Sequence, residues 1–188
     1  VGEALTSPEE GWQRIDDRDS NFVFSGAYGR GTTSADANRC YNNTFTRIGY
    51  EASGSAAFKF YGTKLRFISY HSTSDYSSDV QYKIDGFVEG SYSSLGSHSI
   101  YQYLAFEATD LSPGIHTVEI TLQDVLPIGG TILDAIDIDE TGYMVSYYLP
   151  TNLTAVAGDG EVGLSWDTID GAAGYNVKRS EASGGSYT

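Results

Sequence analysis

Tyrosine-bearing polar loops are the segments of this sequence whose residue types best fit ligand binding. Residues 28–43, 70–79 and 91–99 combine Tyr with Asn, Asp, Ser, Arg and His. Sugars present C–H faces that pack on aromatic rings and hydroxyls that hydrogen-bond to amides, carboxylates and guanidinium groups. Taken singly, each tyrosine is better explained as a residue at the rim of the core, so the hypothesis depends on the cluster. The candidate ligand-binding residues are Tyr28, Tyr41, Asn43, Arg66, Tyr70, His71, Asp75, Tyr76 and Tyr92.

The histidines do not form a recognisable catalytic pattern. His116 stands at the start of the strand-like run GIHTVEI, where we expect it to hydrogen-bond a turn, and His98 lies in a Ser/Gly loop without an evident partner. Nucleophilic catalysis needs a base and an orienting group around the nucleophile. No GxSxG motif supplies them. The sequence therefore favours a protein without catalytic activity.

Carboxylates cluster near the start and the end of the β-rich part of the chain. Asp16 and Asp17 belong to the first cluster, and Asp137 and Asp139 to the second. The first and last strands of a β-sandwich often lie side by side, which would bring these oxygens to one Ca²⁺ at ~2.3–2.6 Å. The alternative is that Asp16 and Asp17 cap turns by bonding backbone amides. The spacing lacks a D-x-D-x-D-G loop, so a structural Ca²⁺ is one of two open interpretations.

The charge and cysteine content narrow the classes of partner. Asp and Glu number 25 against 11 Lys and Arg, a formal net charge of −14 across 188 residues. Such a surface repels nucleic acid and anionic lipid and favours a neutral ligand. A single cysteine, Cys40, excludes an internal disulfide. No stretch has the length of a transmembrane helix or the form of a signal peptide, so a secreted protein would be present here in processed or excised form.

The segment Ala56–Tyr70 predicts the centre of the fold. Phe58 and Phe60 alternate with polar residues before Gly62-Thr63, and Leu65 and Phe67 alternate after it. Period-two alternation around a short Gly-containing loop indicates a β-hairpin with one apolar face. Each fully buried apolar side chain is worth ~1.5–3 kcal/mol. We therefore expect a second sheet over this face.

The remaining strands recur at short intervals, with polar loops or turns between them. The Asp85-Gly86 pair is a strong hairpin signal, Ser112-Pro113-Gly114 marks another turn, and residues 29–39 form a long loop without large apolar side chains. About ten short strands without intervening helices indicate an all-β sandwich or jelly roll. The other expected strands include residues 12–15, 22–26, 44–49, 80–84, 87–92, 103–108, 114–122 and 131–139.

The residues after Pro150 begin a different pattern. Leu164 and Trp166 alternate in one expected strand, and Tyr175 and Val177 in the next. This segment resembles the opening of a fibronectin type III domain, an antiparallel β-sandwich. It spans 39 residues, less than half of such a domain, so we expect the natural chain to continue past Thr188.

Residues 11–140 resemble the galactose-binding-like jelly rolls found among the carbohydrate-binding modules of secreted bacterial glycanases. The likeness is carried by GWQRIDDRDSNFVFSGAY, FKFYGTKLRFIS, VQYKIDG, and LSPGIHTVEI followed by LDAIDI, in that order. Tyr28 stands where these relatives carry a core tryptophan. The shared residues are core and turn positions, so the resemblance implies the fold more directly than a ligand. Such modules are often followed by fibronectin type III spacers.

The sequence as a whole predicts a secreted or cell-surface protein that binds a polysaccharide or oligosaccharide without catalysis, beside further domains of the same chain. A structural or adhesive module without a sugar site is the main alternative. An enzyme such as a jelly-roll polysaccharide lyase is the third, although its Arg/His/Tyr signatures are absent. The expected parts are a lead-in (1–10), a jelly-roll module (11–140), a linker (141–149) and a partial fibronectin type III domain (150–188).

Overall fold

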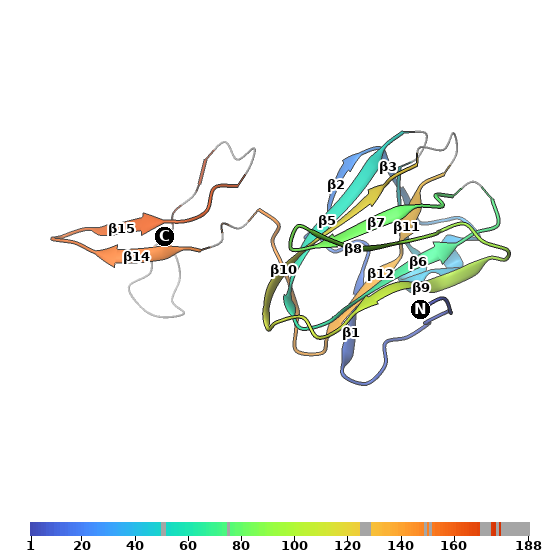
Figure 1. Ribbon diagram of the computed structural model, residues 1–188, viewed down its shortest axis with the longest axis horizontal. Helices are drawn as coiled ribbons and strands as arrows, with labels where there is room; N and C mark the ends of the chain where they lie inside the picture. The colour runs from blue at the N-terminus through green and yellow to red at the C-terminus, as the bar shows by residue number, and fades with distance from the viewer. Residues whose placement is uncertain are drawn as a thin grey trace. The chain divides into compact units, whose positions relative to one another are not determined.

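The computed structural model describes residues 1–49, 52–74, 76–124, 129–148, 150, 152–169, 174, 175 and 177. The chain divides into two compact units, Val1–Tyr147 and Tyr148–Thr188. The first consists mainly of antiparallel strands, and the described part of the second contains one antiparallel hairpin (Figure 1). Among the described residues, no helix has the length and apolar character needed to cross a membrane.

The first unit contains thirteen strands and two short 3₁₀ helices among its described residues. The helices, η1 (Ala37–Arg39) and η2 (Tyr41–Asn43), follow one another in a single connection. The strands are β1 (Trp12–Asp16), β2 (Val23–Gly26), β3 (Tyr28–Gly31), β4 (Phe45–Ile48), β5 (Gly54–Gly62), β6 (Leu65–His71), β7 (Val80–Ile84), β8 (Phe87–Tyr92), β9 (Ile100–Ala108), β10 (Gly114–Leu122), β11 (Thr131–Leu133), β12 (Ala135–Asp139) and β13 (Tyr143–Val145).

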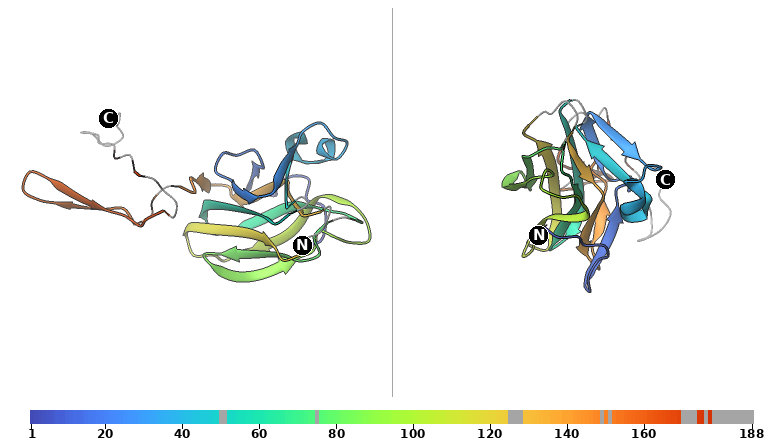
Figure 2. Two further views of the ribbon diagram at one scale, coloured as in Figure 1. Left: turned by 90° about the horizontal axis from the view of Figure 1, so that it is seen from above. Right: turned by 90° about the vertical axis from the view of Figure 1, so that its right-hand side faces the viewer.

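These strands form two large sheets and a smaller third one. The first sheet has the order β1-β12-β6-β9, and the second has the order β13-β5-β10-β7-β8, with β2 also paired to β5. The third sheet, β11-β4-β3, lies beside them. Figure 2 shows the unit as layers of strands without helices between them. The predicted all-β sandwich of the jelly-roll type is confirmed.

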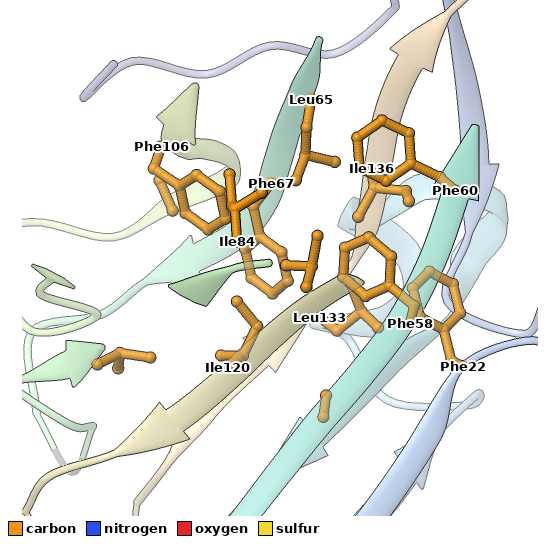
Figure 3. Close-up of a cluster of buried hydrophobic side chains, with 14 of the residues drawn as sticks. Phe22, Phe58, Phe60, Leu65, Phe67, Ile84, Phe106, Ile120, Leu133 and Ile136 are labelled. Carbon is orange, nitrogen blue, oxygen red and sulfur yellow. The ribbon is translucent and has the colours of Figure 1, made fainter. Parts of the chain in front are cut away.

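Aromatic and branched side chains from both large sheets fill the space between them. Phe58 and Phe60 of β5 are fully buried, as are Leu65 and Phe67 of β6. Figure 3 shows these side chains in one cluster with Ile136 of β12 and Ile120 of β10. Because one core is shared, burial of these groups holds the two sheets against each other.

The prediction of a hairpin between β5 and β6 is wrong. The two strands do not pair: β5 pairs with β10, β13 and β2, whereas β6 pairs with β12 and β9. The loop between them carries the chain from one sheet to the other. The four apolar side chains therefore face one another across the core, and β6 itself helps to cover β5.

A carboxylate organises this crossing. Asp139 Oδ2 accepts hydrogen bonds from the backbone N–H of Thr63 at 2.6 Å and of Lys64 at 3.2 Å. The Thr63 hydroxyl donates to Oδ1 of the same carboxylate at 2.7 Å. These bonds satisfy the amides of the loop. They also hold the pKa of Asp139 below its usual value despite partial burial.

Other local predictions are confirmed. Both Asp85 (φ 53°) and Gly86 (φ 83°) have the positive φ that a two-residue hairpin turn requires, and the turn joins β7 to β8. His116 does bond a turn: Nε2 lies 2.8 Å from the Ser112 carbonyl oxygen, and Nδ1 lies 2.7 Å from Asp85 Oδ2.

The segments on either side of the predicted module join it. Ala4 forms a bridge with Tyr103 of β9, and Leu5 packs against Ile68 and Leu104. Within the expected linker, residues 143–145 form β13, whose Met144 packs against the main core. Apolar side chains at these positions add both segments to the sandwich.

The second unit contains one described hairpin, β14 (Thr154–Ala157) with β15 (Val162–Ser165). Its eight residues are all exposed. The Trp166 and Tyr175 rings meet edge to face at 5.2 Å. Tyr175 and Val177 are not in a strand, and residues 176, 178 and 179 of the expected third strand lie outside the described residues. The fibronectin type III resemblance stays a prediction.

Candidate functional site

A wide groove of about 450 Å³ opens along the small third sheet of the first unit. Strand β3 contributes Tyr28 and Arg30, strand β4 contributes Phe45 and Arg47, and Asp36 comes from the connection that follows β3. The segment Thr32–Ser34 adds three hydroxyl-bearing residues. We call this the β3–β4 groove.

Strand alternation explains which β4 side chains reach the groove. Thr46 and Ile48 are fully buried, so Phe45 and Arg47 point to the opposite face of the strand. Gly31 lies directly opposite Phe45 in β3. A Cβ at Gly31 would collide with the Phe45 ring, so this glycine lets the ring lie against the backbone.

An arginine beneath the sheet holds β3 and β4 together. Arg18 Nη2 donates to the carbonyl oxygens of Gly31 at 2.7 Å and Phe45 at 3.2 Å. Its guanidinium also pairs with the fully buried Asp17 carboxylate, whose oxygens accept the hydroxyls of Thr44 and Thr46 at 2.6 Å each. The lining side chains of β3 and β4 therefore stand on a strand pair that is fixed before any ligand arrives.

A cluster of aromatic rings forms the wall behind the groove. Phe45 packs with Tyr70, Tyr76, Tyr101 and Ile132. The rings of Tyr70 and Tyr101 stack at 4.5 Å, and those of Tyr70 and Tyr76 meet edge to face at 5.3 Å. Burial raises the pKa of Tyr76, so its phenol stays protonated at neutral pH.

Polar groups of the groove are oriented by this wall. Arg47 Nη2 donates to the Tyr76 hydroxyl oxygen at 2.8 Å, and the Tyr101 hydroxyl donates to Asp36 Oδ1 at 2.6 Å. Arg39 lies over the Tyr101 ring at 4.9 Å. A guanidinium and a carboxylate are thereby held at defined places beside apolar ring surface. Such an arrangement suits a ligand that has both C–H faces and hydroxyl groups.

Of the nine predicted ligand residues, Tyr28 lines the groove directly. Its side chain is 49% exposed, and its ring stacks on Phe24 at 5.1 Å. Tyr70 and Tyr76 belong to the wall and are buried, so they support the site rather than offer free ring faces. Asp75 lies outside the described residues.

The other predicted residues lie away from the groove. Tyr41 packs against Ile68 and Leu104, and its backbone N–H donates to Asp134. Asn43 is exposed, with φ 59°, in η2. Tyr92 is buried and its hydroxyl lies 3.0 Å from Thr131 Oγ1.

Arg66 and His71 of β6 are engaged elsewhere. Arg66 pairs with Glu9 at 2.8 Å and Glu107 at 2.5 Å, and its guanidinium lies 4.0 Å from the centre of the Trp12 ring. The His71 ring stacks on Tyr103 at 4.8 Å. Both residues are of types that can hydrogen-bond a sugar, but β6 places them on surfaces other than the groove.

The predicted metal ligands are not gathered at one point. Strands β1 and β12 do pair, as expected, but Asp139 lies opposite Trp12, Asp137 opposite Arg14 and Asp16 opposite Ala135.

Each of these carboxylates has a partner within the protein. Arg14 Nε and Nη2 donate to the Asp137 oxygens at 2.6 and 2.9 Å. Asp16 accepts the Arg18 N–H, which is the turn-capping alternative, while Asp17 binds hydroxyls and Asp139 caps the crossing loop. Among the described residues, no group of three or more His, Cys, Asp or Glu side chains is placed to hold a metal ion.

The residues missed by sequence reasoning are Arg30, Asp36, Phe45, Arg47 and Tyr101. Two signals were available. Arg30 and Asp36 lie in the long polar stretch 29–39, and Phe45 and Arg47 are two residues apart in an expected strand, which places them on one face. The position of Tyr101 beside Asp36 follows only from the tertiary fold.

No protein-family model matches the chain. Among solved structures, CBM35 from Cellvibrio japonicus Abf62 superposes with a TM-score of 0.51 at 12% identity, over 71% of this chain and 96% of that one. A family two carbohydrate esterase from the same organism gives 0.50 at 20% identity, over 74% of this chain and 36% of the esterase. The first unit has their fold. At these identities the likeness concerns the fold alone.

Curated relatives match shorter parts of the chain. A type blood N-acetyl-alpha-D-galactosamine deacetylase from Flavonifractor plautii is 31% identical over 106 residues, 56% of this chain and 13% of the relative. An amylopullulanase from Thermoanaerobacterium saccharolyticum is 51% identical over 39 residues, 21% of this chain and 3% of the relative. The chain therefore spans only a small part of the length of these proteins.

Proposed function

We propose that residues 1–147 form a non-catalytic carbohydrate-binding module of a larger secreted protein, and that the β3–β4 groove holds a neutral glycan. The observation that carries this proposal is the groove itself. It places the exposed ring of Tyr28, the ring of Phe45 and the Arg47 guanidinium on a fixed strand pair, beside Asp36 of the following connection. Further domains of the same chain are the expected partners.

The names of the proteins that the chain matches support this proposal. CBM35 has the same fold, and the curated relatives are named as an amylopullulanase and a deacetylase of a sugar derivative. A small module repeated beside different enzymes would explain why this chain matches only a few per cent of each amylopullulanase. Secretion belongs to the same proposal, because the polysaccharides that such a module would bind lie outside the cell.

The contacts of the three histidines favour a role without catalysis. His116 is buried between Asp85 and the Ser112 carbonyl, His71 stacks on Tyr103, and His98 Nδ1 lies 2.9 Å from the Ser97 hydroxyl. None of these rings lines the β3–β4 groove. A general base must lie within hydrogen-bond reach of the reacting group. None of the three histidines is placed to act as one on a ligand in the groove.

Charge argues for a neutral ligand. The chain carries a formal charge of −14, so an acidic polysaccharide is repelled as it approaches. Within the groove, two arginines (Arg30 and Arg47) stand against one carboxylate (Asp36), so the local charge is opposite in sign to the global one. Calorimetry against both classes of polymer tests which field dominates.

The decisive experiment is titration calorimetry with neutral β-glucan, xylan, mannan, galactan and pullulan, and with pectin and alginate as acidic controls. We expect weak binding of a neutral polymer, with Kd between ~1 mM and ~1 μM, or about 4–8 kcal/mol. Tyr28→Ala should weaken it by roughly 5- to 10-fold, since a ring contact is worth about 1 kcal/mol. Phe87→Ala, which removes a 72% exposed ring far from the groove in sequence and sheet order, is the matched control.

Three results would change this conclusion. Binding of pectin or alginate alone would refute the charge argument. Equal losses in Tyr28→Ala and Phe87→Ala would remove the groove as the site. Failure of every polymer to bind at millimolar concentration would favour the structural or adhesive module.

A further inference from the structure

Two exposed tyrosines lie next to each other on the outer face of the second large sheet. Tyr61 of β5 is 40% exposed, and Tyr143 of β13 is 55% exposed. Their ring centroids are 5.2 Å apart, with only 8° between the ring planes. This pair lies outside the β3–β4 groove and is not used by the proposed function.

The sheet register makes the pair part of a longer row. Tyr143 is opposite Tyr61, and Tyr61 is opposite Ile115 of β10, which is 47% exposed. The next residue inward on β5, Phe60, is fully buried, so the row must lie on the outer face. We call Tyr143, Tyr61 and Ile115 the tyrosine row.

The row is rigid because three adjacent strands carry it. Its neighbours on the same face are Lys59 and Thr117, which are opposite each other in the next register position. The Lys59 ammonium lies 5.3 Å from the centre of the Tyr147 ring. Apolar ring surface is thus bordered by groups that donate and accept hydrogen bonds.

The row and the groove stand at opposite ends of β5. The Gly54 end of this strand pairs with Gly26 of β2, two residues before Tyr28 of the groove. Tyr61 is seven residues further along β5, which is roughly 20 Å at about 3.3 Å per residue. One molecule of a short sugar cannot contact both places, whereas a polymer chain is long enough to extend from one to the other.

Charge and size decide which partner fits the row. Two copies of a chain with a formal charge of −14 repel each other, so a second copy is disfavoured. A stable protein interface also needs roughly 20–30 residues on each side, far more than this row of three. A neutral, ring-shaped ligand unit that packs on a few aromatic rings meets both conditions.

We propose that the tyrosine row is a second contact surface for a neutral polysaccharide chain, one that acts together with the β3–β4 groove. The proposal rests on the glycan-binding function proposed above. Two weak contacts on one polymer raise the overall affinity because the second contact forms at a high effective concentration. Short oligosaccharides gain nothing from the row.

The test compares polymer retention with oligosaccharide affinity. Wild-type protein, Tyr61→Ala/Tyr143→Ala and Tyr28→Ala are run on affinity gels containing β-glucan, xylan, mannan, galactan or pullulan, and titrated with the matching trisaccharides to pentasaccharides. Both tyrosines of the row are surface residues, 40% and 55% exposed, so the double variant should fold. Its melting temperature and far-ultraviolet circular dichroism check this, and Phe87→Ala is again the control.

We expect the row variant to lose polymer retention by about 3- to 10-fold while its oligosaccharide affinity stays unchanged. Tyr28→Ala should lower both. A row variant with wild-type retention of every polymer that the wild type binds overturns the row and leaves the groove intact. Loss of retention in the row variant alone, with Tyr28→Ala unaffected, supports the row and contradicts the groove.

Two further readings complete the experiment. Spectra of the protein with ¹³C-labelled tyrosine rings should show shifts of the Tyr61 and Tyr143 signals on addition of the retained polymer, and their absence counts against the row. Sedimentation that shows a dimer lost in the double variant assigns the row to self-association and overturns the proposal. Absence of wild-type retention on every gel overturns the row and the groove together.

Discussion

At the residue scale, buried and partly buried carboxylates have separate tasks in this molecule. Asp137 neutralises Arg14, Asp17 receives two threonine hydroxyls, and Asp139 caps the loop between the sheets. Asp134 is fully buried and accepts the Tyr41 N–H at 2.8 Å. A fully buried carboxylate makes the free energy of unfolding depend on pH.

Burial raises the pKa of Asp134 from 3.8 to about 7. The folded protein therefore binds this proton more tightly than the unfolded chain, and its contribution to stability is complete below pH 4 and lost as pH rises through 7. Urea unfolding at pH 5 and pH 8 should show a loss of roughly 3 kcal/mol in the wild type that Asp134→Asn lacks. Equal losses in both proteins would contradict this assignment.

The Arg14–Asp137 pair leads to a prediction that also tests the metal hypothesis. Both side chains are at most 1% exposed, and removing one partner leaves a buried charge. We expect Asp137→Ala to lower the free energy of unfolding by about 3–5 kcal/mol, with or without EDTA. The double variant Arg14→Met/Asp137→Leu should recover most of this loss.

A bound structural Ca²⁺, as predicted from the sequence, would make stability depend on EDTA. EDTA would then lower the melting temperature of the wild type, and Asp137→Ala would abolish that effect. Metal analysis of the purified protein accompanies the thermal scans.

At the scale of elements, the loop from β5 to β6 determines how the sandwich is connected. It moves the chain from one sheet to the other within a few residues, and the Asp139 carboxylate binds two of its amides and one hydroxyl. Asp139→Ala leaves these amides without their acceptor. We expect a loss of about 1–3 kcal/mol in urea unfolding.

The pH dependence of this contribution has the opposite sign to that of Asp134. Because the folded pKa of Asp139 is lowered, its stabilisation is present above 3.8 and is lost as the pH falls through the folded value. Asp110→Asn is the control, since Asp110 is exposed and Asn tolerates its φ of 63°. A loss in the control as large as in Asp139→Ala would refute the role of the loop.

At the scale of the whole molecule, the two units differ in how much they bury. The first unit encloses a core of aromatic and branched side chains, whereas every residue of β14 and β15 is exposed. An isolated two-stranded hairpin has little stability in water. The two units should therefore open independently.

Hydrogen exchange measures this difference directly. We expect backbone amides of β14 and β15 to exchange within seconds to minutes at neutral pH, while those of residues 56–68 stay protected for far longer. Equal protection in monomeric protein would show that the second unit is stabilised by contacts of its own. The fibronectin type III prediction is tested in the same way on a longer form of the chain.

The sequence by itself determined the local structure of the first unit. Alternation in Phe58–Tyr61 and in Leu65–Phe67 indicated which side chains face the core, and Asp85-Gly86 specified a hairpin turn, because these features depend on neighbours along the chain. Net charge followed from composition alone.

Only the tertiary structure decided which strands pair and where the groove lies. Alternation is the same whether β5 and β6 are neighbours in one sheet or face each other across two, and the Asp139 contact that accompanies the crossing spans 76 residues of sequence. Tyr92 and Tyr28 look alike in a polar loop, yet one is buried beneath Thr131 and the other is half exposed beside Phe45. Burial depends on what packs above a residue, and that is set by segments distant in the chain.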